Sequence, residues 1–146
     1  MWWRDRIYYI TDNTEVHTGH TKMPSQRGEE VHGEHAAAAA TGQEITLYGQ
    51  EQVARTLAAT ESLVVTDITV SASEAATVTV FSDKDDDDTI DTGERIFVAT
   101  FVGSNFGPVS ASFVGTPFYG AKGAKPHVIT TAGTVYLTMT GYILKA

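Results

Sequence analysis

From Ser62 to Leu144 the chain alternates apolar and polar residues in short runs that turn-forming residues separate. In Ser62–Ala72, for example, Ile68 and Val70 flank Thr69, so one face is apolar and the other polar. Alternation with a period of two predicts strands with one buried face. We therefore expect strands in Ser62–Ala72, around Val78 and Val80, and in Arg95–Val102, Val109–Val114, His127–Thr131 and Thr134–Ile143. Because no helical period separates them, they predict an all-β protein, an antiparallel β-sandwich or jelly roll over residues 61–146.

Two of these strands have a second face that needs an explanation. Arg95–Val102 is apolar on both faces, so we expect it to be central in its sheet or to press its second face on a partner. In Thr134–Ile143 the apolar side chains point one way, whereas Tyr136, Tyr142 and several threonines point the other way. This polar face fits either a solvated sheet surface or a subunit interface, in which tyrosine is enriched.

The first sixty residues show no such plan, and we expect an extended N-terminal arm over residues 1–60 that becomes ordered against a neighbour. Arg6–Ile10 and Ile45–Tyr48 have the aromatic and β-branched residues of strands. Ala36–Ala40 could form a turn of helix, although five alanines cannot outweigh the cost of helix nucleation. Gln50–Ala59 fits a helix and a strand equally well.

Composition narrows the classes of function. The 146-residue chain has a formal net charge of -8 and 19% charged residues, with no stripe of lysine and arginine. Nucleic acid is therefore a disfavoured partner, because binding to phosphates needs such a stripe. The absence of cysteine removes disulfides, thiolate catalysis and cysteine-ligated zinc. Neither a stretch of about 20 apolar residues nor a signal-peptide core occurs, so we expect synthesis in a cytoplasm and no membrane partner.

Most of the net negative charge comes from one loop, Asp83–Glu94, which holds seven carboxylates and one lysine. Counted from Asp83, oxygen-bearing residues fall at positions one, three, five, seven, nine and twelve. This is the spacing of a calcium loop of EF-hand type, which ends in a bidentate glutamate. Calcium is therefore the candidate cofactor, and the predicted ligands are Asp83, Asp85, Asp87, the backbone carbonyl of Thr89, Asp91 and Glu94.

Two features of the loop depart from that motif. Position six, where the turn favours glycine, is Asp88, which must then adopt a left-handed backbone conformation. Predicted strands flank the loop, where helices would be expected. The alternative interpretation is a solvated hairpin tip whose charges protect a sheet edge and keep the protein soluble.

Other candidate metal-binding and catalytic residues have less support in the sequence. Two His-x-x-His pairs, His17/His20 and His32/His35, lie in a glycine-rich stretch with no helix to set ligand geometry. We interpret them as loop residues and not as a zinc site. The chain has no Gly-x-Ser-x-Gly elbow and no support for a serine–histidine–aspartate triad, so we expect no enzymatic activity.

The start of the chain combines aromatic and cationic side chains. Adjacent tryptophans at an exposed terminus would be a liability, and tryptophan and arginine are common interface anchors. The segment either docks into a groove of a partner or folds back onto its own sandwich. The residues predicted to bind a partner are Trp2, Trp3, Arg4, Arg6, Tyr8 and Tyr9, together with Tyr136 and Tyr142.

Three segments together resemble a known family: the strand Leu63–Val70, the acidic hairpin that ends in Ile90–Glu94, and the closing run Ala132–Tyr142. Across Ser62–Tyr142 the chain is similar to the small jelly-roll decoration, or cement, proteins of tailed bacteriophage capsids. The resemblance implies a non-enzymatic virion protein on the capsid exterior. It also implies a homotrimer whose arms bind the major capsid protein and stabilise the phage head.

Similar sandwiches also occur in phage tails and fibres. That alternative implies a carbohydrate- or receptor-binding module. Its sugar rings would stack on exposed aromatic residues, for which the candidates are Tyr136, Tyr142, Phe118 and Tyr119.

Overall fold

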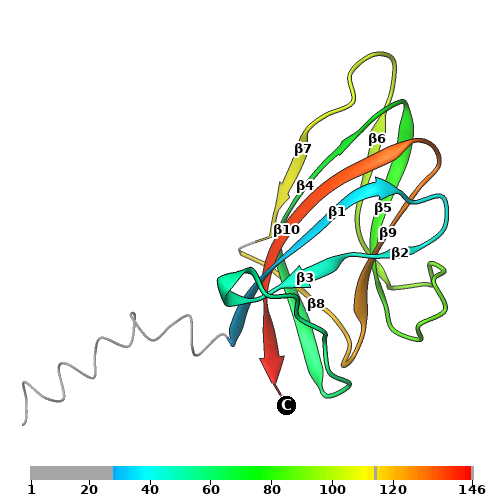
Figure 1. Cartoon of the computed structure of the whole chain (residues 1–146). Helices are drawn as coiled ribbons and strands as arrows, with labels where there is room; N and C mark the ends of the chain where they lie inside the picture. The colour runs from blue at the N-terminus through cyan, green and yellow to red at the C-terminus, as the bar shows by residue number, and fades with distance from the viewer. Residues whose placement is uncertain (1–27, 114, 146) are drawn as a thin grey trace, which may run out of the picture.

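The computed structural model describes residues 28–113 and 115–145. They form two antiparallel sheets packed face to face, so the predicted all-β sandwich is confirmed (Figure 1). The larger sheet has the strand order β3-β1-β10-β4-β7, with β8 also paired to β4, and the smaller sheet has the order β2-β9-β5-β6. The strands are β1 (Glu29–Ala38), β2 (Gln43–Glu44), β3 (Thr46–Tyr48), β4 (Glu61–Ala72), β5 (Ala76–Asp83), β6 (Arg95–Phe101), β7 (Val109–Ser112), β8 (Phe118–Tyr119), β9 (Lys125–Thr130) and β10 (Thr134–Lys145).

A short 3-10 helix, η1 (Gln50–Gln52), follows β3. The segment Gln50–Ala59, which the sequence left open between helix and strand, otherwise contributes one isolated bridge, between Tyr48 and Ala54. Within the residues that the structure describes, no helix is long and apolar enough to cross a membrane.

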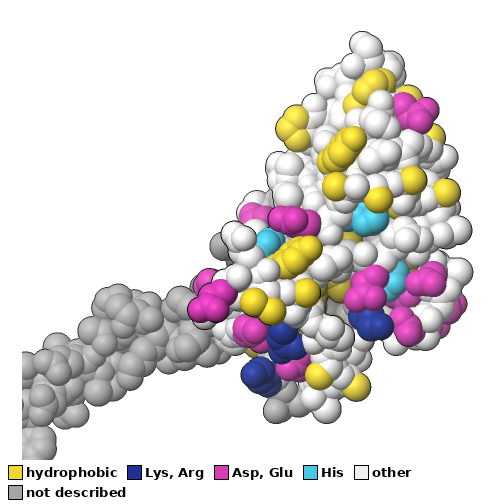
Figure 2. All heavy atoms as spheres, viewed as in Figure 1, with side chains coloured by type: hydrophobic (Ala, Val, Ile, Leu, Met, Phe, Trp, Pro, Cys, Tyr) yellow, Lys and Arg dark blue, Asp and Glu magenta, His cyan; other side chains and the backbone are white. Residues whose placement is uncertain are grey.

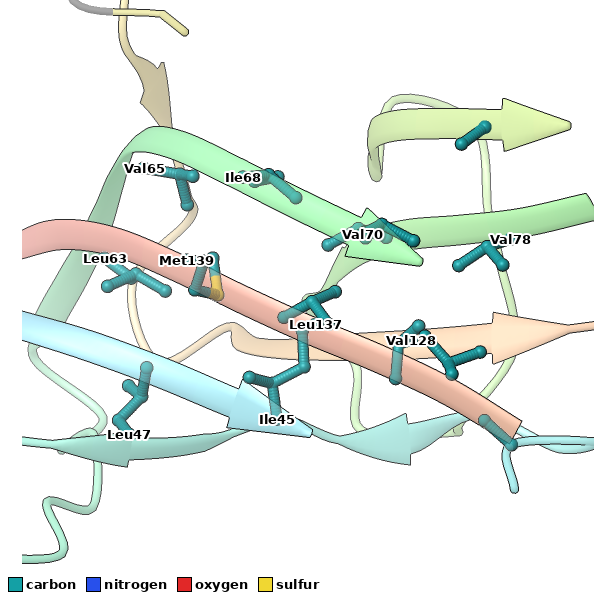
Figure 3. Packing of buried hydrophobic residues seen from close by; sticks show 14 of the residues in the cluster. Ile45, Leu47, Leu63, Val65, Ile68, Val70, Val78, Val128, Leu137 and Met139 are labelled. Carbon is teal, nitrogen blue, oxygen red and sulfur yellow. The ribbon is translucent and has the colours of Figure 1, made fainter. Parts of the chain in front are cut away.

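Inward side chains of both sheets fill the space between them. Figure 3 shows Ile68 and Leu137 of the larger sheet in the same buried cluster as Val78 and Val128 of the smaller sheet. All four are at most 3% exposed. Burial of apolar surface stabilises a fold by roughly 25 cal/mol per Å². Burial of the apolar side chains that alternate along β4 and β10 therefore helps to hold the two sheets together.

The predicted domain boundary at residue 60 is wrong, because residues 29–48 belong to the sandwich. β1 pairs with β10 along ten consecutive positions and with β3 on its other side. This strand was not predicted because one of its inward positions is Gly33, which interrupts the alternation of apolar and polar residues. A Cβ at Gly33 would lie 2.6 Å from Met139 and 2.9 Å from Ile45, so the core has no room for a side chain there.

The alanine run belongs to the same strand. Ala36–Ala38 continue β1, and no helical turn forms in the run, because pairing with β10 outweighs a helix propensity that cannot nucleate in so short a segment. The remainder of the predicted arm, residues 1–27 with the expected strand Arg6–Ile10, lies outside the described residues.

The strand that is apolar on both faces is not central. β6 pairs with β5 alone and forms an edge of the smaller sheet. Its inward residues Ala99 and Phe101 are buried, whereas Val98 is 48% exposed on the opposite face. The other expectation, that this second face presses on a partner, stays a prediction.

One arginine organises the segment between β3 and β4. Arg55 Nη2 lies 3.0 Å from Glu29 Oε2 and 2.8 Å from Glu61 Oε1, so it joins the beginnings of β1 and β4. The N–H of Ala58 also donates to Glu61, at 3.0 Å. The hydrogen bonds from Arg55 and Ala58 lower the pKa of Glu61, although desolvation opposes ionisation.

Replacing Arg55 with methionine should lower the Tm by about 5 °C, because two carboxylates lose their shared partner while an apolar stem is retained. Arg95→Met, at an exposed position of β6, is the matched control and should change the Tm by no more than about 1 °C. Thermal unfolding followed by circular dichroism measures both. Equal Tm values in the two variants would contradict the structural role of Arg55.

Candidate metal centre and binding face

The acidic loop closes the hairpin between β5, which ends at Asp83, and β6, which begins at Arg95. Figure 2 shows acidic side chains gathered at the lower right of the surface, where this loop lies in Figure 1, with lysine and histidine atoms beside them. Asp88, at position six, has a φ of 61°. The left-handed conformation predicted for Asp88 is therefore confirmed, at a position where glycine would be the usual residue.

Asp83 is the structural centre of the loop. Its side chain is buried and accepts hydrogen bonds from the backbone N–H groups of Asp86 at 2.7 Å, Asp87 at 3.4 Å and Asp88 at 2.9 Å. Burial acts to raise the pKa of Asp83, but these hydrogen bonds outweigh it, and the pKa is lowered overall. The carboxylate is thus held ionised at the position of the first ligand of a calcium loop.

Glu94 closes the loop from the other end. Its side chain is buried, Oε1 accepts a hydrogen bond from the N–H of Lys84 at 3.1 Å, and Oε2 accepts one from the N–H of Asp91 at 2.8 Å. Each carboxylate oxygen has about two acceptor sites. The backbone therefore orients Glu94 and leaves acceptor capacity for a cation.

Three of the six predicted ligands come together. One carboxylate oxygen from each of Asp83, Asp85 and Glu94 lies within 4.8 Å of the other two. Calcium binds oxygen at about 2.3–2.6 Å, so two of its ligands are at most about 5 Å apart, and this trio fits the ion. Burial and the charges of Asp87, Asp91 and Glu94 raise the pKa of Asp85. A bound cation would relieve that repulsion.

Among the predicted carboxylate ligands, Asp87 and Asp91 do not group with this trio. Asp87 accepts hydrogen bonds from the N–H and the hydroxyl of Thr89, at 2.9 and 2.7 Å, and Asp91 is outside the cluster. Calcium takes six to eight oxygens, so an ion held by Asp83, Asp85 and Glu94 would also need water or further loop oxygens.

Sequence reasoning missed His127, which lies under the same loop. Its Nε2 is 3.0 Å from Asp88 Oδ1 and 3.8 Å from Asp83 Oδ2, and its ring is buried. His127 comes from β9, opposite Phe81 of β5, so only the register of the smaller sheet brings it to the loop. No local spacing in the sequence signals that contact. Lys125, also from β9, places Nζ 3.7 Å from Asp86.

A second feature is the outer face of the larger sheet. The pairing register aligns its outward residues in rows that cross β3, β1, β10, β4 and β7. Most of these residues carry hydroxyl groups, and no lysine or arginine is among them. We call this surface the hydroxyl face; its rows are Tyr48, His32, Thr140, Asp67 and Ser112; then Thr46, Glu34, Thr138, Thr69 and Ser110; then Ala36, Tyr136 and Ser71.

Hydrogen bonds link neighbouring strands across the hydroxyl face. Thr69 and Ser110 hydroxyls lie 2.9 Å apart, and the hydroxyl of Thr140 donates to Asp67 at 3.1 Å. Hydrogen bonds from Ser112, Thr66 and Thr140 lower the pKa of Asp67, whereas desolvation opposes them. The face is therefore ordered before anything binds to it.

Both predicted partner-binding residues of β10 lie on this side of the sheet. Tyr136 is 51% exposed and adjoins a hollow of about 300 Å³, which Glu34, Thr69 and Thr138 also line. Tyr142 adjoins a hollow of about 410 Å³ farther along the strand, beside Thr140. The remaining predicted partner-binding residues, which are Trp2, Trp3, Arg4, Arg6, Tyr8 and Tyr9, lie outside the described residues.

The second histidine pair does not form a site. The register places His32 on the hydroxyl face, where its ring stacks on Tyr48 with centroids 5.2 Å apart. His35 is three positions away on the same strand and therefore points to the opposite side. Both residues lie in β1, so the interpretation of this pair as loop residues is wrong, and His17 and His20 lie outside the described residues.

Comparison with known protein families, with characterised proteins and with solved structures found no match for this chain. Its function is therefore inferred from the acidic loop and the hydroxyl face.

Proposed function

We propose that this protein is a non-enzymatic assembly module that packs against other protein through the hydroxyl face. The single observation that carries the proposal is the exposure of Tyr136 on the central strand, β10, of a sheet face whose rows contain no lysine or arginine. Tyrosine is enriched and lysine depleted in protein interfaces, because tyrosine contributes large contact area at little cost in side-chain entropy.

The assembly that we propose is a bacteriophage head, on which the protein acts as a decoration protein. The resemblance of Ser62–Tyr142 to capsid cement proteins supports this choice. In this scheme the hydroxyl face packs within a homotrimer, and the leading segment with Trp2, Trp3 and Arg4 binds the major capsid protein. A trimer then bridges several shell subunits at once, so modest single contacts add up through multivalency.

Self-association of the purified full chain tests the proposal. Sedimentation velocity over a range of concentrations should find a species of three times the 15.7 kDa chain mass. Tyr136→Ala should weaken trimer formation at least about tenfold, as loss of a central aromatic anchor does in other interfaces. Tyr119→Ala removes a somewhat more exposed tyrosine, on β8 and 62% exposed, and is the control. A chain that remains monomeric at every concentration would overturn the trimer.

A carbohydrate-binding module is the second candidate, and one observation favours it. Tyr142 and Tyr136 each adjoin a hollow that hydroxyl side chains also line. Sugar rings bind by stacking on aromatic faces while their hydroxyls bond to such side chains. Binding of the wild type to a glycan array, lost in Tyr142→Ala, would favour this function over assembly.

We also propose that the acidic loop binds calcium through Asp83, Asp85 and Glu94. The ion would offset the repulsion among the carboxylates and hold the β5–β6 hairpin in one conformation. The role is structural, because the loop lies on the smaller sheet, away from the hydroxyl face of the larger one.

A further inference from the structure

A second group of ligand atoms lies on the outer side of the smaller sheet. His127 of β9 stands opposite Phe81 of β5, and Asp83 is two residues farther along β5. The loop then folds back over this corner, and Asp88 comes to rest beside the histidine. One ligand atom from each of Asp83, Asp88 and His127 lies within 4.8 Å of the other two.

The ring of His127 faces hydrogen-bond acceptors at both nitrogens. Nδ1 lies 3.2 Å from the carbonyl oxygen of Lys125, while Nε2 faces Asp88 Oδ1 at 3.0 Å and Asp83 Oδ2 at 3.8 Å. A neutral imidazole has a single N–H. When Nδ1 donates to the carbonyl, Nε2 faces two carboxylates, and either a proton on Nε2 or a metal ion between the three groups can satisfy them.

The ring is also fixed in place. His127 is 2% exposed, and its centroid lies 5.4 Å from that of Phe81. A hydrogen bond from one ring nitrogen to a backbone carbonyl is the usual outer-shell support of a metal-bound histidine, because it sets the tautomer and aims the other nitrogen. The orientation of His127 is therefore that of a ligand.

We propose that Asp83, Asp88 and His127 bind a first-row transition metal ion, with Zn²⁺ as the reference ion. Imidazole nitrogen suits such ions, whereas calcium and magnesium prefer oxygen ligands. Ligands of a tetrahedral zinc, at about 2.0–2.1 Å from the metal, lie about 3.3 Å from one another. The two measured separations from Nε2, 3.0 and 3.8 Å, bracket that value. Asp88 is 63% exposed, so water can reach a fourth position.

This site is distinct from the calcium site in the residues that define it. Asp85 and Glu94 belong only to the calcium trio, and Asp88 and His127 belong only to the new group, while Asp83 is common to both. The N–H groups of Asp86 and Asp87 both donate to Asp83 Oδ1, whereas Oδ2 accepts from Asp88 alone among the described residues and is the oxygen with capacity for a metal ion. The inference does not depend on calcium binding or on the role in assembly.

Titration of the full chain with Zn²⁺ in the presence of excess Ca²⁺ tests the proposal. Calorimetry should find a Zn²⁺ site in the wild type. Asp88→Asn should lower the affinity of this site for Zn²⁺ at least about tenfold, because a charged ligand is lost. Asparagine accepts a left-handed backbone, so the loop conformation is retained. Asp86→Asn is the matched control, because Asp86 has a φ of 60° and a similarly exposed carboxylate. It should bind Zn²⁺ as the wild type does.

A second measurement addresses His127 directly. Co²⁺ in a four-coordinate site of nitrogen and oxygen ligands absorbs visible light much more strongly than Co²⁺ in water. This additional absorption should be present in the wild type and in His35→Ala but largely lost in His127→Gln and in Asp88→Asn. If His127→Gln does not fold, Asp88→Asn decides alone. Identical Zn²⁺ isotherms for the wild type, Asp88→Asn and Asp86→Asn would overturn the proposal and leave the three residues as an ion pair. Lack of Zn²⁺ binding by the wild type both with and without Ca²⁺ would do the same.

Discussion

Replacing Asp83 with alanine should lower the free energy of unfolding by about 3 kcal/mol, the largest effect on stability that we expect from a single loop residue. The carboxylate accepts three backbone hydrogen bonds that shape the loop, from Asp86, Asp87 and Asp88. Hydrogen bonds to a charged group contribute about 1.5–3 kcal/mol each, and water replaces part of that contribution at an exposed loop. Urea unfolding in the presence of EDTA measures the contribution of these hydrogen bonds to the free energy of unfolding, separately from that of any bound ion.

The matched control is Asp87→Ala. Asp87 is exposed, and the hydrogen bonds that its carboxylate accepts from Thr89 are local, so we expect a loss below about 1 kcal/mol. The difference between wild type and Asp83→Ala should also depend on pH. Because the folded state lowers the pKa of Asp83, its contribution is complete above the unfolded pKa of about 3.9 and is lost as the pH falls through the folded value. A difference that stays constant down to pH 2 would contradict the role of the charged carboxylate.

The sequence predicted the strands whose apolar positions carry large side chains. β4 and β10 bury a branched or long residue at nearly every second position, and both were expected within two residues of their observed ends. β1 was missed because its inward side includes Gly33, which must be small to pack against Met139. Its pairing with β10 is set by a partner about one hundred residues away, and no local pattern encodes such a contact.

The same difference between local and long-range signals separates the part of the candidate metal centre that the sequence predicted from the part that it missed. The spacing of Asp83, Asp85 and Glu94 is a property of one loop, so counting residues was sufficient to group them. The left-handed conformation at Asp88 followed from the same count. His127 reaches the loop only through the register of β9 on β5, and that register depends on the whole smaller sheet.

The two candidate functional features occupy different sheets, so their proposed roles are separable. The hydroxyl face lies on β3, β1, β10, β4 and β7, whereas the acidic loop joins β5 to β6 and His127 lies on β9. Substitutions at Tyr136 should therefore leave metal binding unchanged, and substitutions in the loop should alter self-association only if the ion stabilises the fold as a whole. The independence of distant sites is the usual outcome for changes that share no partners.

Replacing Glu94 with glutamine should weaken calcium binding by at least about 100-fold, since even the outer-shell partners of metal ligands contribute up to about that factor. In the wild type, calcium at 100 times its Kd should stabilise the fold by about 2.7 kcal/mol and raise the Tm accordingly. Glutamine keeps an oxygen that can accept one of the backbone hydrogen bonds from Lys84 and Asp91, so the variant should fold in EDTA. At the same calcium concentration it should gain no more than about 0.4 kcal/mol.

Glu30→Gln removes the same charge from an exposed position of β1 and is the control for net charge. It should bind calcium with the affinity of the wild type, because long-range charge effects at physiological salt are screened within about 8 Å. Calorimetry and thermal unfolding with and without calcium distinguish the outcomes. Absence of heat and of a Tm rise in the wild type would show that the buried carboxylates of Asp83 and Glu94 serve only to fold the loop. The remaining carboxylates would then act as a solvated, charged tip that protects the neighbouring edge strand β6.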